Sequence, residues 1–77
     1  MNAHAQILKQ HRQAAAYVAL ALNVIPLAKG VDDLRTWWND EQRRRDEYGL
    51  TETQTQTLIE ACSEHVRSVG ETRGGHL

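Results

Sequence analysis

Apolar positions recur along most of the chain with the spacing of an α-helix, and the strand-like alternation of apolar and polar residues is missing. One proline and three glycines divide the chain into helical stretches: Pro26, Gly30, Gly49 and Gly70. The pattern predicts an all-α protein, a small three-helix bundle with helices over about 3–23, 31–48 and 52–69. Residues 1–70 are expected to form a single helical domain, and the tail 71–77 is expected to be disordered.

The first predicted helix carries two apolar faces. One stripe, at about 100° per residue, is the expected core face. Its members are Ile7, Leu8, His11, Ala15, Val18, Leu22 and Ile25. Tyr17, Leu20 and Val24 point away from that stripe, and a helix that is apolar on all sides needs burial on all sides. Tyr17, Leu20 and Val24 are therefore expected to form a self-association face of a homodimer. Burial of this helix at the centre of the bundle is the alternative.

The second and third predicted helices are joined by a short turn. Gly49 is placed to end the second helix, and Leu50 to make the hydrophobic contact of a Schellman-type stop. Thr51 begins the next helix, with Gln54 three residues later completing a capping box. These residues predict a tight antiparallel hairpin, whose second helix is expected to stop at Gly70.

One face of the second predicted helix combines aromatic and charged residues, and it is the candidate partner-binding surface: Trp37, Trp38, Glu41, Arg45 and Tyr48. Glu41 and Arg45 lie four residues apart with the acid first, the favourable order for a helical ion pair. Trp, Tyr and Arg are the residues found most often as binding hot spots. Two alternatives stay open: the charges lie at the rim of the core over the Trp rings, or the pair fixes the register of a self-association interface.

A nucleic-acid-binding function is the alternative hypothesis, and the charge of the chain argues against it. The chain has nine Lys and Arg and ten Asp and Glu, for a net charge of −1. Affinity for nucleic acid rests on neutralising phosphates, and the chain has no excess of basic residues for this. The segment 39–47 holds three arginines but four acids, so a solvated, self-neutralised helix face is favoured. A small dimeric helix-turn-helix regulator would use these residues: Arg43, Arg44, Gln54 and Gln56.

Catalytic and metal-binding motifs are missing from the sequence, which has no Gly-rich phosphate loop, nucleophile motif or HExxH. Cys62 and His65 lie three residues apart, a spacing that supplies half of a metal site. Cys62 also lies on the apolar stripe of its helix, where a small buried thiol is common. We therefore expect no catalytic residue, no metal and no cofactor.

The remaining features concern location and function. Cys62 is the only cysteine, so no disulfide forms within one chain. The apolar stretch 14–22 is shorter than the roughly 20 residues that span a membrane, and no signal peptide is recognisable, so a cytoplasmic protein is expected. The favoured hypothesis is a small non-enzymatic protein–protein interaction module. It has the style of a phage or mobile-element inhibitor or adaptor that binds and blocks a larger host protein.

Overall fold

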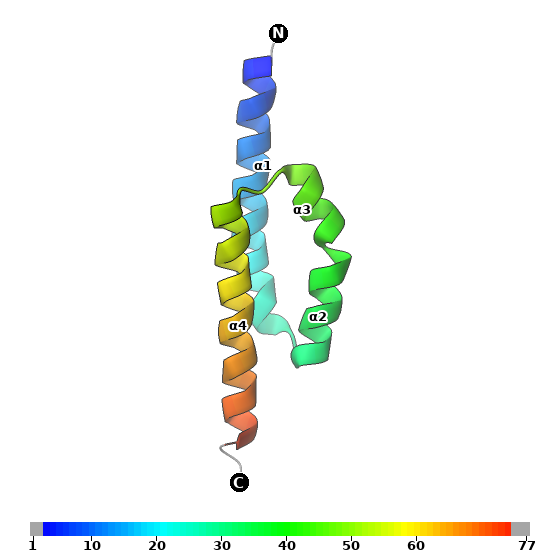
Figure 1. Cartoon of the computed structure of the whole chain (residues 1–77), viewed down its shortest axis with the longest axis vertical. Coiled ribbons are helices and arrows are strands. Elements are labelled where there is room, and N and C mark those ends of the chain that lie inside the picture. Colours follow the sequence, from blue (N-terminus) through cyan, green and yellow to red (C-terminus); the bar gives the residue numbers. More distant parts are fainter. Residues whose placement is uncertain (1–2, 75–77) are drawn as a thin grey trace.

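The computed structural model describes the backbone of residues 3–74 and the side chains of residues 9–70. Over this part the chain is all-α, as predicted, and contains no strand. The elements are α1 (Ala3–Val24), the short 3-10 helix η1 (Ile25–Leu27), α2 (Val31–Asp40), α3 (Gln42–Tyr48) and α4 (Glu52–Gly74). Figure 1 shows that the chain runs down α1, up α2 and α3, and down α4, so the two long helices are parallel and α2–α3 is antiparallel to both.

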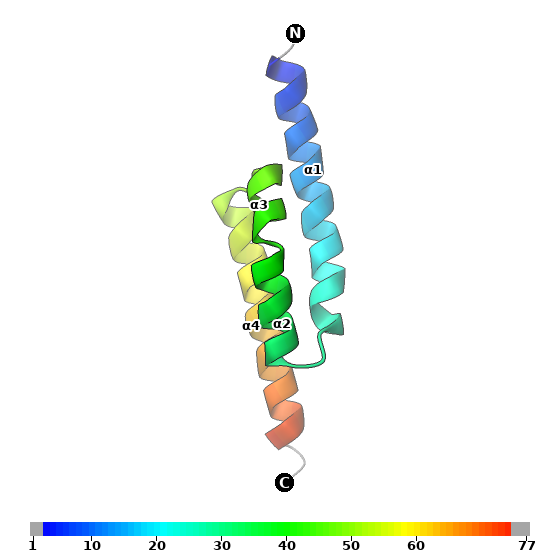
Figure 2. The ribbon, with the colours of Figure 1, turned by 90° about the vertical axis from the view of Figure 1, so that its right-hand side faces the viewer.

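The molecule is elongated. Its radius of gyration is 15.1 Å and its extents are 61 × 18 × 17 Å, whereas a compact domain of this length has a radius of gyration of about 11.5 Å. The first turns of α1 project beyond the other helices at one end, and the last turns of α4 project at the opposite end (Figures 1 and 2). The helices therefore overlap along only part of their lengths, and the core is confined to the middle.

The core is small and draws on α1, η1, α2 and α4. Its buried cluster consists of Tyr17, Ala21, Ile25, Leu34 and Leu58. Ile25 and Leu58 are the largest side chains that are fully buried among the described residues. Such a core is at the lower limit of what stabilises a small helical domain without disulfides or metal.

The face of α1 that enters the core differs from the predicted stripe. Tyr17, predicted to point away from the core, is 5% exposed, and Leu22, predicted to be buried, is 38% exposed. Ala15 is exposed as well, and Ile7 and Leu8 lie outside the described side chains. The structure selects the Tyr17 face because its ring is large and its hydroxyl finds a hydrogen-bond acceptor on the neighbouring helix, Glu41.

The predicted helix over 31–48 is divided at Glu41. Its backbone angles are φ −88° and ψ −2°, away from helical values near ψ −42°. At this point the guanidinium of Arg45 donates a hydrogen bond to the carbonyl oxygen of Trp38 at 2.8 Å. A side chain inserted beside the backbone ladder is a known cause of helix irregularity, so this contact accounts for the break between α2 and α3.

The turn between α3 and α4 forms as predicted. Gly49 adopts the left-handed conformation with φ 65°, and its N–H donates to the carbonyl of Asp46 at 3.2 Å. The N–H of Leu50 donates to the carbonyl of Arg45 at 3.4 Å, which completes the Schellman pattern. The capping box is confirmed too. The Thr51 N–H donates to Gln54 Oε1 at 3.0 Å, and the Gln54 N–H donates to Thr51 Oγ1 at 3.1 Å.

The prediction that Gly70 ends the last helix is wrong. Helix α4 continues through Gly70 to Gly74, so residues 71–74 of the predicted disordered tail are helical, and 75–77 lie outside the described residues. Unlike proline, glycine retains its N–H, and its cost of about 1 kcal/mol in a helix does not by itself end one. No described helix has the length and apolarity needed to cross a membrane.

Candidate interaction surfaces

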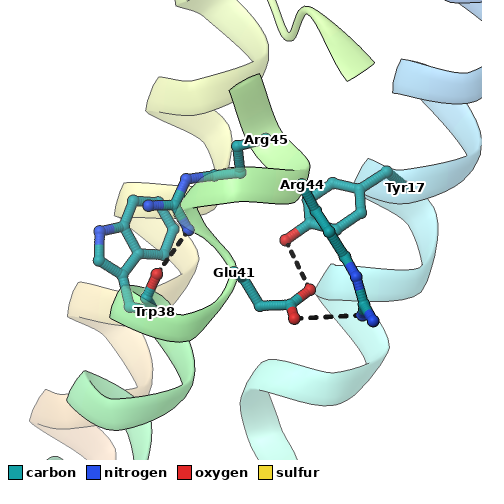
Figure 3. A network of polar contacts seen from close by, with 5 residues as sticks. All are labelled: Tyr17, Trp38, Glu41, Arg44 and Arg45. Carbon is teal, nitrogen blue, oxygen red and sulfur yellow. Dashed lines mark hydrogen bonds and ion pairs between the residues drawn. The ribbon is translucent and has the colours of Figure 1, made fainter. Parts of the chain in front are cut away.

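A polar network connects α1 to the junction of α2 and α3, and Glu41 is at its centre (Figure 3). The Tyr17 hydroxyl donates to Glu41 Oε1 at 3.1 Å, and Arg44 Nη1 donates to Glu41 Oε2 at 3.2 Å. The Arg44 side chain is 63% exposed, so solvent weakens this ion pair to about 1 kcal/mol or less. The bond from the buried Tyr17 is the part of the network that fixes α1 against α3.

Arg45 contacts an aromatic ring instead of the carboxylate predicted for it. Its guanidinium carbon lies 3.7 Å from the centroid of the Trp38 ring, in addition to the hydrogen bond to the Trp38 carbonyl. The predicted Glu41–Arg45 ion pair is wrong, because the ion pair of Glu41 is with Arg44. The arrangement matches the alternative in which the charges lie at the rim of the core over the tryptophans.

The environment of Tyr17 strongly favours its neutral form. Burial, followed by the hydrogen bond to Glu41 and the negative charge of that carboxylate, raises the pKa of Tyr17 to about 12. The Tyr17 ring also packs against the Tyr48 ring, with centroids 5.5 Å apart and planes tilted by 55°. Tyr17 therefore belongs to the interior of a single chain.

The five residues of the predicted partner-binding surface lie close together, and each of them is half-buried: Trp37, Trp38, Glu41, Arg45 and Tyr48. The three aromatic residues pack against the buried cluster. Much of this face is thus used to join α2 and α3 to the other helices. Its role in binding a partner stays a prediction. Trp38 also reaches an open groove, and Glu41 and Tyr48 line a smaller hollow of about 260 Å³ beside Ala16 and Leu20 of α1.

That groove lies between α2 and α4 and has a volume of about 480 Å³. It is lined by Val31, Leu34, Arg35, Trp38, Ile59, Cys62, Ser63 and Val66. Leu34 is buried, while Val31, Ile59 and Val66 are each more than a third exposed. We refer to this surface as the α2–α4 groove. The sequence did not reveal it, because its two walls come from helices whose packing the apolar pattern alone does not specify.

The residues predicted for self-association do not share one face of the structure. Leu20 is 62% exposed, Val24 is half-buried and Tyr17 is buried. Of the three, only Leu20 therefore lies openly on the surface. The prediction that all three form an outward face is wrong for Tyr17, whereas self-association itself stays a prediction.

The residues assigned to the alternative DNA-binding function are separated by the fold. Arg44 pairs with Glu41, and the amide of Gln54 is bonded to the backbone of Thr51. Gln56 is exposed in a shallow hollow that also contains Glu52 and Glu60, two carboxylates that would face phosphates. Arg43 is exposed, and helices α3 and α4 run antiparallel (Figure 1) rather than at the 90–120° of a helix-turn-helix.

Cys62 and His65 have separate roles in the structure. Burial raises the pKa of the Cys62 thiol, partly offset by the positive charge of Arg45, so the thiol is held in its less reactive form. His65 Nε2 lies 2.8 Å from the carbonyl oxygen of Ala28. Because a carbonyl can only accept, Nε2 carries the proton, and the bond ties α4 to the connector after η1. Within the described residues, no group of three or more His, Cys, Asp or Glu is placed to hold a metal ion.

Comparison of the chain with protein-family models, with curated proteins and with solved structures finds no match.

Proposed function

We propose that this protein is a small non-enzymatic module that binds another protein, and that the partner docks in the α2–α4 groove. The observation that carries the proposal is the exposed apolar surface formed there by Val31, Ile59 and Val66 around the buried Leu34. Apolar side chains gathered on one surface, rather than scattered singly, are typical of binding sites.

The shape and charge of the groove favour an amphipathic helix as the docking element. Its walls run from Val31 to Trp38 on α2 and from Ile59 to Val66 on α4, about two helical turns each. A partner helix would fill it with apolar residues spaced i, i+3 and i+7. Arg35 is the one charged residue of its lining, and no acid lines it. We therefore propose that the partner helix carries a carboxylate facing Arg35.

In this proposal the residues of the predicted partner-binding surface on α2 and α3 have two roles. Trp38 contacts the partner directly, as part of the groove lining. Arg45 stacks on the Trp38 ring and bonds to its carbonyl, so it orients this contact. Trp37 and Tyr48 pack against the buried cluster and Glu41 accepts the hydrogen bond of Tyr17, so these three hold α2 and α3 in place.

The proposed mode of action is to occupy a surface of a larger protein, as an inhibitor or adaptor would. With 77 residues and no catalytic motif, the chain offers a surface rather than a reaction. The proposal includes a cytoplasmic location, which suits the free, half-buried thiol of Cys62. It also includes a homodimer, in which each copy contributes three helical segments: α1, α2 with α3, and α4.

The test is a comparison of tagged variants in nuclease-treated lysate of the source cells, read by mass spectrometry. Wild type should retain one host protein near stoichiometrically, and Ile59→Glu and Val66→Glu should each reduce its recovery at least tenfold. Ile59 and Val66 are partly exposed, so a glutamate there is expected to leave the helical circular dichroism unchanged. Leu20→Glu, an equal change on α1 outside the groove, serves as the matched control. It should retain the partner even where it weakens the homodimer, because each copy carries its own groove.

Three results would contradict the proposal. Recovery of the partner by the groove variants at the wild-type level would move the binding site elsewhere. Loss of binding with Leu20→Glu alone would assign the site to α1. Recovery of nucleic acid without nuclease, with a steep loss of affinity as salt rises, would favour the DNA-binding alternative.

A further inference from the structure

We infer that a second copy of this chain covers the outward surface of α1, paired antiparallel about a two-fold axis near Ala19 and Leu20. This inference rests on the homodimer of the proposed function and gives that homodimer a location and an orientation. The surface, called here the outer face of α1, consists of Ala15, Ala16, Ala19, Leu20, Leu22 and Asn23 of α1 together with Leu27 of the following η1.

The outer face of α1 is apolar and uncharged although it is exposed. Leu20 is 62% and Leu27 is 76% exposed, the two highest values among the large apolar side chains of the described residues. No charged residue occurs between Arg12 and Lys29. The amide of Asn23, the polar side chain on this face, donates to the carbonyl of Ala19 on its own helix at 3.1 Å. Apart from the hollow that Ala16 and Leu20 share with Glu41 and Arg44, the face offers van der Waals contact and little else.

The surface area of the chain is larger than a folded monomer of its mass requires. The accessible surface is 5925 Å², whereas a compact monomer of this mass exposes about 4,700 Å². The excess is about 1,200 Å², and a standard interface buries about 800 Å² on each partner. Part of this excess belongs to the projecting ends of α1 and α4 (Figure 1), and a second copy on the outer face of α1 would remove another part without any change of fold.

The order of small and large residues along the face favours an antiparallel pair. Ala15, Ala16 and Ala19 occupy its first half, and Leu22 and Leu27 lie in the second half with Leu20 near the centre. A two-fold axis perpendicular to the helix near Ala19 and Leu20 sets Leu20 of each copy beside Ala19 of the other and Leu22 within one residue of its Ala16, which lets large side chains fill the space over small ones. Leu27 then lies level with Arg12 of the other copy, beyond the alanines. A parallel pair would instead place alanine against alanine and leucine against leucine.

The charges near the two ends of the outer face of α1 also favour an antiparallel pair. Lys9 and Arg12 are exposed on the projecting part of α1, and Asp32 and Asp33 are exposed in the first turn of α2. In an antiparallel pair Lys9 of one copy extends toward the start of α2 in the other, where Lys29, Asp32 and Asp33 together carry a net charge of −1. In a parallel pair Lys9 and Arg12 would meet their own copies, and like charges repel.

The test begins with mass measured by light scattering and sedimentation over 5 to roughly 200 µM, a range that brackets weak and ordinary homodimers. Wild type should approach twice the mass of one chain. Ala19→Glu and Leu20→Glu should each raise the dimer dissociation constant at least tenfold. Because both positions are exposed, neither variant should lose helical circular dichroism. Ile59→Glu, in the α2–α4 groove, is the matched control and should dimerise like wild type.

Orientation is tested by cross-linking single cysteines with a short bifunctional maleimide in a Cys62→Ala background. Ala19→Cys lies near the proposed axis and should cross-link between copies. Arg12→Cys would be separated from its equivalent by about 22 Å in the antiparallel pair and should not cross-link. A monomer at the highest concentration, a dimer insensitive to Ala19→Glu and Leu20→Glu, or efficient cross-linking through Arg12→Cys would each overturn the inference. Failure of the wild-type dimer to capture any partner would instead count against the proposed function alone.

Discussion

Removing the hydroxyl of Tyr17 gives the most informative test of how α1 is held. The Tyr17→Phe variant keeps the buried ring and its contact with Tyr48 but loses the hydrogen bond to Glu41. At neutral pH the expected cost is about 1 kcal/mol. Arg44 continues to pair with the Glu41 carboxylate, so no unpaired charge is left behind.

The larger effect of this change is expected at alkaline pH. The pKa of Tyr17 is about 12 in the folded protein, against 10.0 for a free tyrosine. Because the folded value is higher, the stabilisation is complete below pH 10 and is lost as pH rises toward 12. A difference of two pKa units corresponds to roughly 3 kcal/mol, about half of it lost by pH 11. For a domain stabilised by roughly 3–5 kcal/mol this is a large fraction.

The assay is urea unfolding followed by circular dichroism between pH 8 and pH 11.5. The free energy of unfolding of wild type should fall by roughly 1 kcal/mol more than that of Tyr17→Phe between pH 9 and pH 11. The raised pKa of Cys62 gives a loss of the same sign, but it is common to both proteins and cancels in the difference.

A second variant separates burial from charge at Tyr17. Glu41→Gln keeps an acceptor for the hydroxyl and removes the negative charge. It should lower the pKa of Tyr17 while leaving it above 10, since burial is the main cause of the shift. Parallel pH profiles for wild type and Tyr17→Phe would refute the placement of Tyr17 in the core.

Two further predictions concern the core and the turn. Leu58→Ala removes a fully buried side chain and should lower the free energy of unfolding by about 2–5 kcal/mol, enough to unfold most of the protein, as measured by thermal melts. Ile59→Ala, at the adjacent and 40% exposed position, should cost much less. Equal losses for the two variants would contradict the described face of α4. Gly49→Ala should destabilise by about 1 kcal/mol in urea titrations because φ is 65° there. Nothing lies within 4 Å of the added methyl group, so a cost near zero would mean that the left-handed turn is absent.

Residues that act on their own chain neighbours were predictable from the sequence. The stop at Gly49 and the capping box of Thr51 and Gln54 need only backbone groups within a few residues, and both form as expected. The all-helical content follows from apolar spacing in the same way. Gly70 shows the limit of such local arguments, because a glycine ends a helix only where the chain must turn.

Predictions that required knowledge of a second helix failed. The sequence of α1 is apolar on every side beyond Ala14, so periodicity could not decide which stripe would be buried. That choice depends on Glu41, 24 residues away along the chain, which accepts the hydroxyl of Tyr17. The same contact turns Glu41 toward α1, while Arg45 lies over Trp38. The predicted helical ion pair was therefore replaced by contacts between helices.

The two proposed surfaces differ in a way that suits different occupants. The outer face of α1 has no charge between Arg12 and Lys29, so it carries little to distinguish one apolar partner from another except its shape. In a two-fold pair the two surfaces are complementary in shape, because each copy presents both the small and the large half of the same face. The α2–α4 groove has Arg35 at its lining, and a charge rejects partners that lack a matching carboxylate. Since the groove is built by α2 and α4, pairing through α1 leaves a groove open on each copy.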